Sequence, residues 1–194
     1  MNVRLGEIAE LRTGPSRSGR SAAAGPGDRK VALISGSDIW DDRLGTSLPL
    51  ISIPGNELTE RHLLAAYDVV VTGKSTAVKA AYVPPDLGPT IANSTLVVVH
   101  PHDPDLGVFL WWYLTSPQGR RELESRMIGS ATIASLPPAA VARVEVPVPE
   151  RRRLHVITEM IETSEKAYLA ALGAAEQRRM ALRAALVREL ANGR

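Results

Sequence analysis

The stretch RRRLHVITEMIETSEKAYLAALGAAEQRRMALRAALVREL, residues 151–190, decides the fold of this chain. It contains no proline, and its only glycine is Gly173. Alanine, leucine, glutamate, arginine, glutamine and methionine dominate it, and all of them are strong helix formers. We therefore predict one continuous helix, which at about 1.5 Å per residue would be roughly 60 Å long.

Apolar residues recur along this stretch, mostly at alternating gaps of three and four. They are Leu154, Ile157, Ile161, Tyr168, Leu172, Ala175, Leu182, Leu186 and Leu190. This spacing is typical of a coiled-coil seam rather than of the wider apolar stripe of a globular helix. Because a helix this long cannot bury its seam against a small domain beside it, we expect it to pair with a partner helix.

Polar residues and one glycine interrupt the seam. Polar side chains stand where apolar ones are expected, at Ser164 or Glu165 and at Arg178 or Arg179. Gly173 costs the helix roughly 1 kcal/mol relative to alanine. The pairing should therefore be discontinuous, with polar patches where another subunit could dock.

The composition narrows the class of protein. The chain has 194 residues, a net charge of +2 and no cysteine, and its pI is about 9.1. The lack of cysteine excludes disulfides and thiolate metal sites and fits a reducing cytoplasm. The first residues have no long apolar segment of the signal-peptide type, and no apolar run approaches 18 residues, so we expect a cytoplasmic protein with no membrane partner.

Residues 1–149 contain short segments of two kinds, which predicts an α+β domain in front of a helix at residues 150–194. Strands are expected at residues 31–34, 48–53, 68–72, 77–83, 96–99 and 141–146, where β-branched residues cluster. A tight polar turn is expected to join strands 68–72 and 77–83. Helices are expected at residues 57–64 and 106–126, with a break at Pro117, and a short helix or turn at residues 3–11. Residues 127–132 are expected to form a polar turn.

No catalytic motif is complete. Residues 73–75, GKS, match the end of a phosphate-binding loop, but that motif needs a glycine where Asp68 stands. His100 and His102 are better explained by a surface turn than by a metal site. The acidic pair Asp41 and Asp42 is expected on a solvated loop. We therefore predict no cofactor, no metal and no enzyme acting alone.

Three polar turns interrupt the apolar segments, at residues 14–27, 73–76 and 129–132. Each mixes glycine with small hydroxyl residues. Glycine lets a backbone N–H approach phosphate closely, and hydroxyl or cationic side chains can contact phosphate or base edges. Taken singly, each segment fits an ordinary turn better, so the chemistry alone leaves both interpretations open.

Basic and aromatic residues give a similarly open picture. Arginines and a lysine crowd the first thirty residues, and three arginines stand together at residues 151–153. Such loops can meet phosphate, although from charge alone a solvated surface explains them better. Trp111 and Trp112 fit the buried and exposed sides of one helix better than a base-stacking platform, since neighbours on a helix cannot both face inward.

The order of these segments resembles the specificity subunit of type I restriction–modification enzymes, in a form with one target-recognition domain and one long helix. The resemblance covers essentially the whole chain. It is carried by RLGEIAELRTG (4–14), ALISGSDIW (32–40), YDVVVTGKSTAVKAAYV (67–83), IANSTLVVVHP (91–101) and, as the nearest match, FLWWYLTSPQGRRELESRMIGSATIASLPPAAVARVEVPVP (109–149). Two departures stand out: residues 151–153 are arginines where the family usually has a Glu-Gln pair, and the chain has one domain and one helix instead of two of each.

The resemblance implies a function in DNA recognition and a set of partners. It implies a non-catalytic subunit that binds double-stranded DNA and directs a methyltransferase subunit, and in some systems a nuclease (restriction) subunit, to a sequence. DNA contacts would come from Arg17, Arg20, Lys74, Ser75, Thr76, Lys79, Ser130 and Thr132. The seam residues given above would join two copies as an antiparallel homodimer. The alternative is an assembly protein related to specificity subunits that has no sequence-specific DNA binding of its own.

Overall fold

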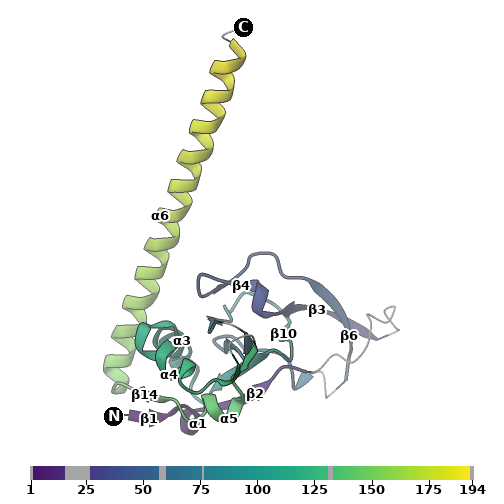
Figure 1. Ribbon diagram of the computed structural model, residues 1–194, viewed down its shortest axis with the longest axis vertical. Helices are drawn as coiled ribbons and strands as arrows, with labels where there is room; N and C mark the ends of the chain where they lie inside the picture. Colours follow the sequence, from purple (N-terminus) through teal and green to yellow (C-terminus); the bar gives the residue numbers. More distant parts are fainter. Residues whose placement is uncertain (1, 16–26, 57–59, 76, 131–132, 193–194) are drawn as a thin grey trace. The chain divides into compact units, whose positions relative to one another are not determined.

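The computed structural model describes residues 2–15, 27–56, 60–75, 77–130 and 133–192. The chain divides into two compact units, Met1–Leu154 and His155–Arg194. The first unit mixes short strands and helices, and helix α6 (Arg151–Asn192) forms the described part of the second (Figure 1). The predicted α+β class and the long C-terminal helix are both confirmed.

The core of the first unit is a four-stranded antiparallel sheet. Its strand order is β2 (Ala9–Thr13), β11 (Leu96–Pro101), β7 (Val69–Thr72) and β9 (Ala80–Tyr82). Strand β7 is buried along its whole length, and β11 is buried at every position except His100. Their valine-rich sequences suit strands covered on both faces.

The first unit also contains a second sheet, of three strands. Its order is β10 (Thr90–Ala92), β3 (Asp28–Ile34) and β6 (Leu50–Pro54), with β10 parallel and β6 antiparallel to β3. Ile34 at the end of β3 packs with Val70 and Val98 of the first sheet in one buried cluster. The two sheets therefore share a core.

Smaller elements complete the unit. Strand β1 (Asn2–Arg4) pairs with β14 (Glu145–Pro147), β4 (Ile39–Trp40) pairs with β5 (Arg43–Leu44), and β8 (Lys74–Ser75) joins β13 (Ile133–Ser135) and β12 (Ile128–Ser130). The short helices are α1 (Leu5–Ile8), α5 (Pro138–Val141) and the 3-10 turns η1 (Gly36–Asp38) and η2 (Pro104–Leu106). None of the described helices combines the length and the apolar content that a membrane span requires.

The helix predicted at residues 106–126 forms as two, α3 (Gly107–Thr115) and α4 (Pro117–Glu124). Ser116 ends α3, and its Oγ accepts a hydrogen bond of 3.1 Å from the Gly119 N–H, which caps the start of α4. Proline at the next position suits a first helical turn. On α3, Trp111 is 3 % exposed and Trp112 45 %, as the sequence predicted.

Several local predictions are wrong, two of them because a segment far away in the sequence pairs with the backbone. Residues 9–13 form strand β2 instead of continuing the opening helix, since β11 pairs with them. Residues 128–130 form β12 instead of a turn, and residues 74–75 pair with β13 instead of forming a tight turn. The last predicted strand begins only at residue 145, after α5. Of the helix predicted at residues 57–64, residue 60 is helical and residues 57–59 lie outside the described residues, whereas residues 61–62 form a turn and Leu63 forms a β-bridge with Ile91.

Candidate nucleic-acid interface

One end of the core sheet gathers several polar segments. It is the end of β7 at Thr72, which pairs with Leu96 of β11. The Gly73 N–H donates to the Thr95 carbonyl at 2.7 Å, and the Leu136 N–H donates to the Gly73 carbonyl at 2.7 Å. These bonds bring β7, β11 and β13 together, and we refer to this region as the Thr72 end of the sheet.

Strand β8 follows β7 in the chain at this end of the sheet and contains two of the predicted DNA-binding residues. Lys74 and Ser75 pair with Ser135 and Ala134 of β13, and the Lys74 N–H also donates to Thr95 at 3.1 Å. The Lys74 side chain is exposed and makes no ion pair with another described residue. Its ammonium is therefore a charge on a fixed backbone that is free to meet phosphate.

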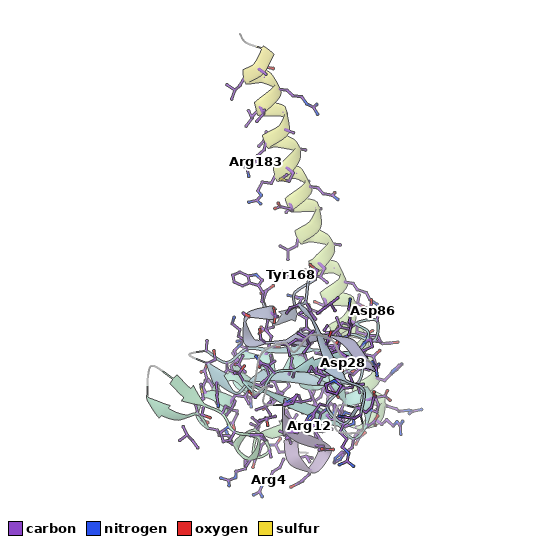
Figure 2. The ribbon with its side chains drawn as sticks, turned by 90° about the vertical axis from the view of Figure 1, so that its right-hand side faces the viewer. Arg4, Arg12, Asp28, Asp86, Tyr168 and Arg183 are labelled. Carbon is purple, nitrogen blue, oxygen red and sulfur yellow. The ribbon has the colours of Figure 1, made fainter. Side chains whose placement is uncertain are left out.

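The β12–β13 hairpin extends the same three-stranded sheet. Figure 2 shows this hairpin, in green, projecting from the side of the first unit. Ile128 at its base is 65 % exposed. Gly129 has φ 130°, a backbone conformation that residues other than glycine rarely adopt. Of the predicted Ser130, only the backbone is described, in β12. The predicted contacts Arg17, Arg20, Thr76 and Thr132 lie outside the described residues.

Lys79, another predicted DNA contact, is engaged within the fold. Its Nζ donates to the Ile39 carbonyl of β4 at 3.1 Å, and its backbone N–H donates to Thr72 Oγ1 at 3.0 Å. The side chain is half-buried. Lys79 therefore fastens β4 to the Thr72 end of the sheet, and we expect it to contribute less to DNA contact than Lys74.

Strands β4 and β5 form a two-residue hairpin at this end. Asp41 and Asp42, its turn, both have positive φ (49° and 57°), the conformation of a type I′ turn. Asp42 forms an ion pair with Arg120 of α4, and its carbonyl accepts a 2.8 Å bond from Trp111 Nε1. The prediction of a solvated acidic pair is therefore wrong for Asp42, whose side chain is only 23 % exposed.

A second polar cluster lies at the opposite end of the core sheet. Asp68 is fully buried, and its Oδ1 lies 2.6 Å from His100 Nδ1 while the Ala65 N–H donates to Oδ2 at 3.0 Å. Burial raises the pKa of the Asp68 carboxyl, although the bond to His100 opposes that shift. His100 thus belongs to strand β11 and to a hydrogen bond with Asp68, and the prediction that it lies on a surface turn is wrong.

A cleft of about 520 Å³ opens beside this pair. Its walls are formed by Glu10, Arg12, Arg61, His62, Leu63, Ala65 and His100. Burial, with a smaller effect of the Arg12 charge, lowers the pKa of His62. The negative charges of Glu10 and Asp68 offset the positive charges of the two arginines. Among the described residues, no group of His, Asp or Glu could hold a metal ion.

Helix α6 carries the predicted seam. Leu154 belongs to the first unit and is buried, and Ile157 and Ile161 lie on the following turns. From residue 168 onward the predicted seam is exposed to solvent: Tyr168 42 %, Leu172 48 %, Leu182 61 %, Leu186 55 % and Leu190 76 %, with Ala175 also exposed. Leu169, Met180 and Val187, which do not belong to the predicted seam, are exposed as well. Their spacing returns them to one side of the helix, next to the seam.

Comparison with known proteins shows which solved structures share this fold. No protein-family model matches the sequence, and no curated protein matches it. Among solved structures, a chain from a structure on complex assembly and conformational transition of the type I restriction–modification (R-M) system superposes with a TM-score of 0.57 at 15 % identity, over 88 % of this chain and 39 % of that one. The type I R-M system S subunit from M. genitalium gives a TM-score of 0.57 at 12 % identity, over 89 % and 41 %.

A third similar structure is that of an enzyme. The type IIG restriction endonuclease BpuSI superposes with a TM-score of 0.58 at 10 % identity, over 83 % of this chain and 26 % of that one. At these identities the likeness concerns the fold, and the chain spans about two-fifths of the length of the type I chains that it matches. The chain therefore has the fold of a type I specificity subunit's recognition region together with its long C-terminal helix, as the resemblance in the sequence predicted.

Proposed function

We propose that this chain is a non-catalytic DNA-recognition subunit of a type I restriction–modification system, acting in the cytoplasm as a homodimer. It binds double-stranded DNA and directs a methyltransferase subunit to its site, together with a nuclease subunit where the system has one. The observation that carries the proposal is the fold, which the first unit and α6 share with type I S subunits.

The Thr72 end of the core sheet supports the DNA contact. Lys74 is exposed there, on a strand held by hydrogen bonds on both sides. The projecting β12–β13 hairpin continues the same small sheet, so polar backbone and side chains can approach a duplex together. A lysine contact to phosphate contributes affinity that falls as salt rises, because counterions are released on binding.

Helix α6 supports the dimer. Its exposed apolar side chains between residues 168 and 190 form a strip of the kind that soluble monomers rarely leave uncovered. Two copies paired antiparallel through this strip place one recognition unit at each end and read a two-part, symmetric site. The neighbouring Leu169, Met180 and Val187 then remain as a surface on which the methyltransferase subunit docks.

The test is a footprint with the cognate methyltransferase present, followed by titrations of variants. We expect protection of a defined two-part sequence, and we expect Lys74→Ala and Arg17→Ala each to weaken binding and to reduce the salt slope by about one. Lys166→Ala, which removes an exposed lysine from α6, is the matched control and should bind as the wild type does. Assembly with the methyltransferase without any defined footprint would instead establish the alternative, an assembly protein without sequence-specific DNA binding.

A further inference from the structure

Trp40 is the most exposed large apolar side chain among the described residues, at 79 %. It lies on β4, immediately before the turn of the β4–β5 hairpin. An indole that stays in water does not gain the burial of 150–250 Å² that such a side chain can contribute at an interface. An indole held in water on a tight hairpin is therefore a candidate contact, provided that the hairpin is rigid.

The hairpin is rigid because its inner side is fastened at several points. Ile39, next to Trp40, is fully buried in the core cluster with Val70, and its carbonyl accepts the bond from Lys79. In the turn, the Asp42 carbonyl accepts the bond from Trp111. Alternation along the strand sends Ile39 inward and Trp40 outward, so the core fixes where the indole stands.

Trp40 lies at the same end of the core sheet as the candidate interface. Lys79, which holds β4, also donates its backbone N–H to Thr72, two residues before Lys74. A Cβ built on Gly36, just before the hairpin, would lie 3.5 Å from Thr72 Cγ2. The hairpin, η1 and strand β8 therefore share the Thr72 end of the core sheet.

The chemistry around Trp40 favours DNA over a protein surface. The three carboxylates nearby are already engaged: Asp38 accepts bonds from the Ser35 N–H and hydroxyl, Asp41 pairs with Arg43 at 2.7 Å, and Asp42 pairs with Arg120. The charges of Asp41 and Asp42 are thus offset at close range by arginines, which lets phosphate approach. The other apolar residues of the hairpin, Ile39 and Leu44, are buried in or packed against the core, so neither accompanies Trp40 on the outward side. A tryptophan at a protein interface normally stands in an apolar patch.

We infer that the β4–β5 hairpin enters the major groove and that Trp40 contributes to specificity by apolar contact with thymine C5-methyl groups. The major groove admits a two-stranded ribbon, and the thymine methyl is its one apolar marker of sequence. This inference rests on the proposed function and adds to it a residue that neither the basic-residue pattern nor the glycine-rich turns had indicated.

The test uses the full-length protein and a duplex that the wild type selects from a random pool. A second duplex of the same sequence carries deoxyuridine for thymidine, which removes only the C5-methyl groups. Burying roughly 60 Å² of indole at about 25 cal/mol per Å² corresponds to about tenfold in affinity. We expect the wild type to bind the uracil duplex about tenfold more weakly than the thymine duplex.

The variants supply the decisive comparison. Trp40→Ala should bind the thymine duplex about tenfold more weakly than the wild type and should not distinguish the two duplexes. Trp112→Ala removes a partly exposed indole from α3 and is the matched control, expected to retain the preference for thymine. Trp40→Ala should melt at the wild-type temperature because its side chain is in water, so lost binding is not lost folding.

Two results overturn the inference. One is Trp40→Ala binding as tightly as the wild type, and the other is Trp40→Ala keeping the full preference for thymine over uracil. If either occurs while Lys74→Ala still weakens binding, the proposed function stands and only the role of Trp40 falls. If the wild type selects no duplex from the pool, the proposed function fails and the role of Trp40 fails with it.

Discussion

Placing charges in the exposed seam of α6 tests the proposed homodimer most directly. The perturbation is the double variant Leu172→Asp with Leu182→Asp. Both leucines are about half exposed in the single chain, at 48 % and 61 %. In a two-fold dimer each substitution occurs twice, so four leucines lose their burial at once.

The size of the effect follows from the exposed fraction. Complete burial of a leucine side chain is worth about 1.5–3 kcal/mol, and roughly half of it, ~1 kcal/mol, remains available to each of these residues. Four leucines therefore contribute ~4 kcal/mol, which corresponds to about a thousandfold in the dissociation constant. Desolvation of four carboxylates adds to this loss, so the dimer should dissociate at micromolar concentration.

The assay is sedimentation velocity or light scattering at tens of micromolar protein. The wild type should show a mass near twice that of the 20.9 kDa chain, and the double variant the mass of one chain. Gln177→Asp with Ala181→Asp is the matched control, since both residues are exposed and face away from the seam by helical periodicity; it should remain a dimer. A monomeric wild type would refute the dimer itself, and a dimeric seam variant would place the interface elsewhere.

Two further predictions concern the first unit. Arg120→Ala should lower the free energy of unfolding by about 2 kcal/mol, because the guanidinium donates hydrogen bonds to the Thr115 and Val78 carbonyls as well as pairing with Asp42. Urea denaturation measures this loss, with Arg121→Ala, at the exposed neighbouring residue, as the control. Arg120→Lys should recover little of the lost stability. Asp68→Asn should gain stability relative to the wild type as pH rises above the ordinary carboxyl pKa of 3.8. Burial raises the pKa of Asp68, so the folded wild type keeps its proton to higher pH than the unfolded chain and loses stability across that interval. Denaturation curves between pH 4 and 7 in which the variant instead falls behind would contradict this sign.

The elements that the sequence predicted well are those that local chemistry determines. Helix α6 is continuous from Arg151 because strong helix formers dominate it, and the break at Pro117 follows from the missing N–H of proline. Strand β7 is equally local, since a run of three valines fits a strand buried on both faces. Each of these predictions needed no information from another part of the chain.

The errors lie where pairing between distant segments decides the structure. Residues 74–75 have the composition of a turn, yet they form strand β8 because β13, about sixty residues later, supplies the partner backbone. His100 looked like part of a polar turn, yet the buried carboxylate of Asp68 holds it at the end of β11. Such pairings depend on loop closures that composition does not encode.

The candidate site divides in the same way. Lys74 and Ser75 could be proposed from residue type and a resemblance of motifs, and the structure places them on an accessible strand. Trp40 could not, because tryptophan is a highly buried residue type on average and no local pattern in the sequence indicates its exposure. Its exposure follows from the two-residue turn at Asp41 and Asp42, which sets the register that turns Ile39 inward.

The β4–β5 hairpin is held in place without the side chain of Trp40. The β4–β5 hairpin is held by its inward side chains Ile39 and Leu44, by its backbone carbonyls and by the Asp42 side chain of its turn. Trp40 itself makes no part of that framework, so its replacement should change what the hairpin contacts without changing where the hairpin stands. If the proposed function holds, different residues at this position would redirect sequence preference at little cost in stability, and a set of Trp40 variants, each selected against a random duplex pool, measures that directly. Variants that all selected the wild-type sequence would show that the hairpin takes no part in recognition.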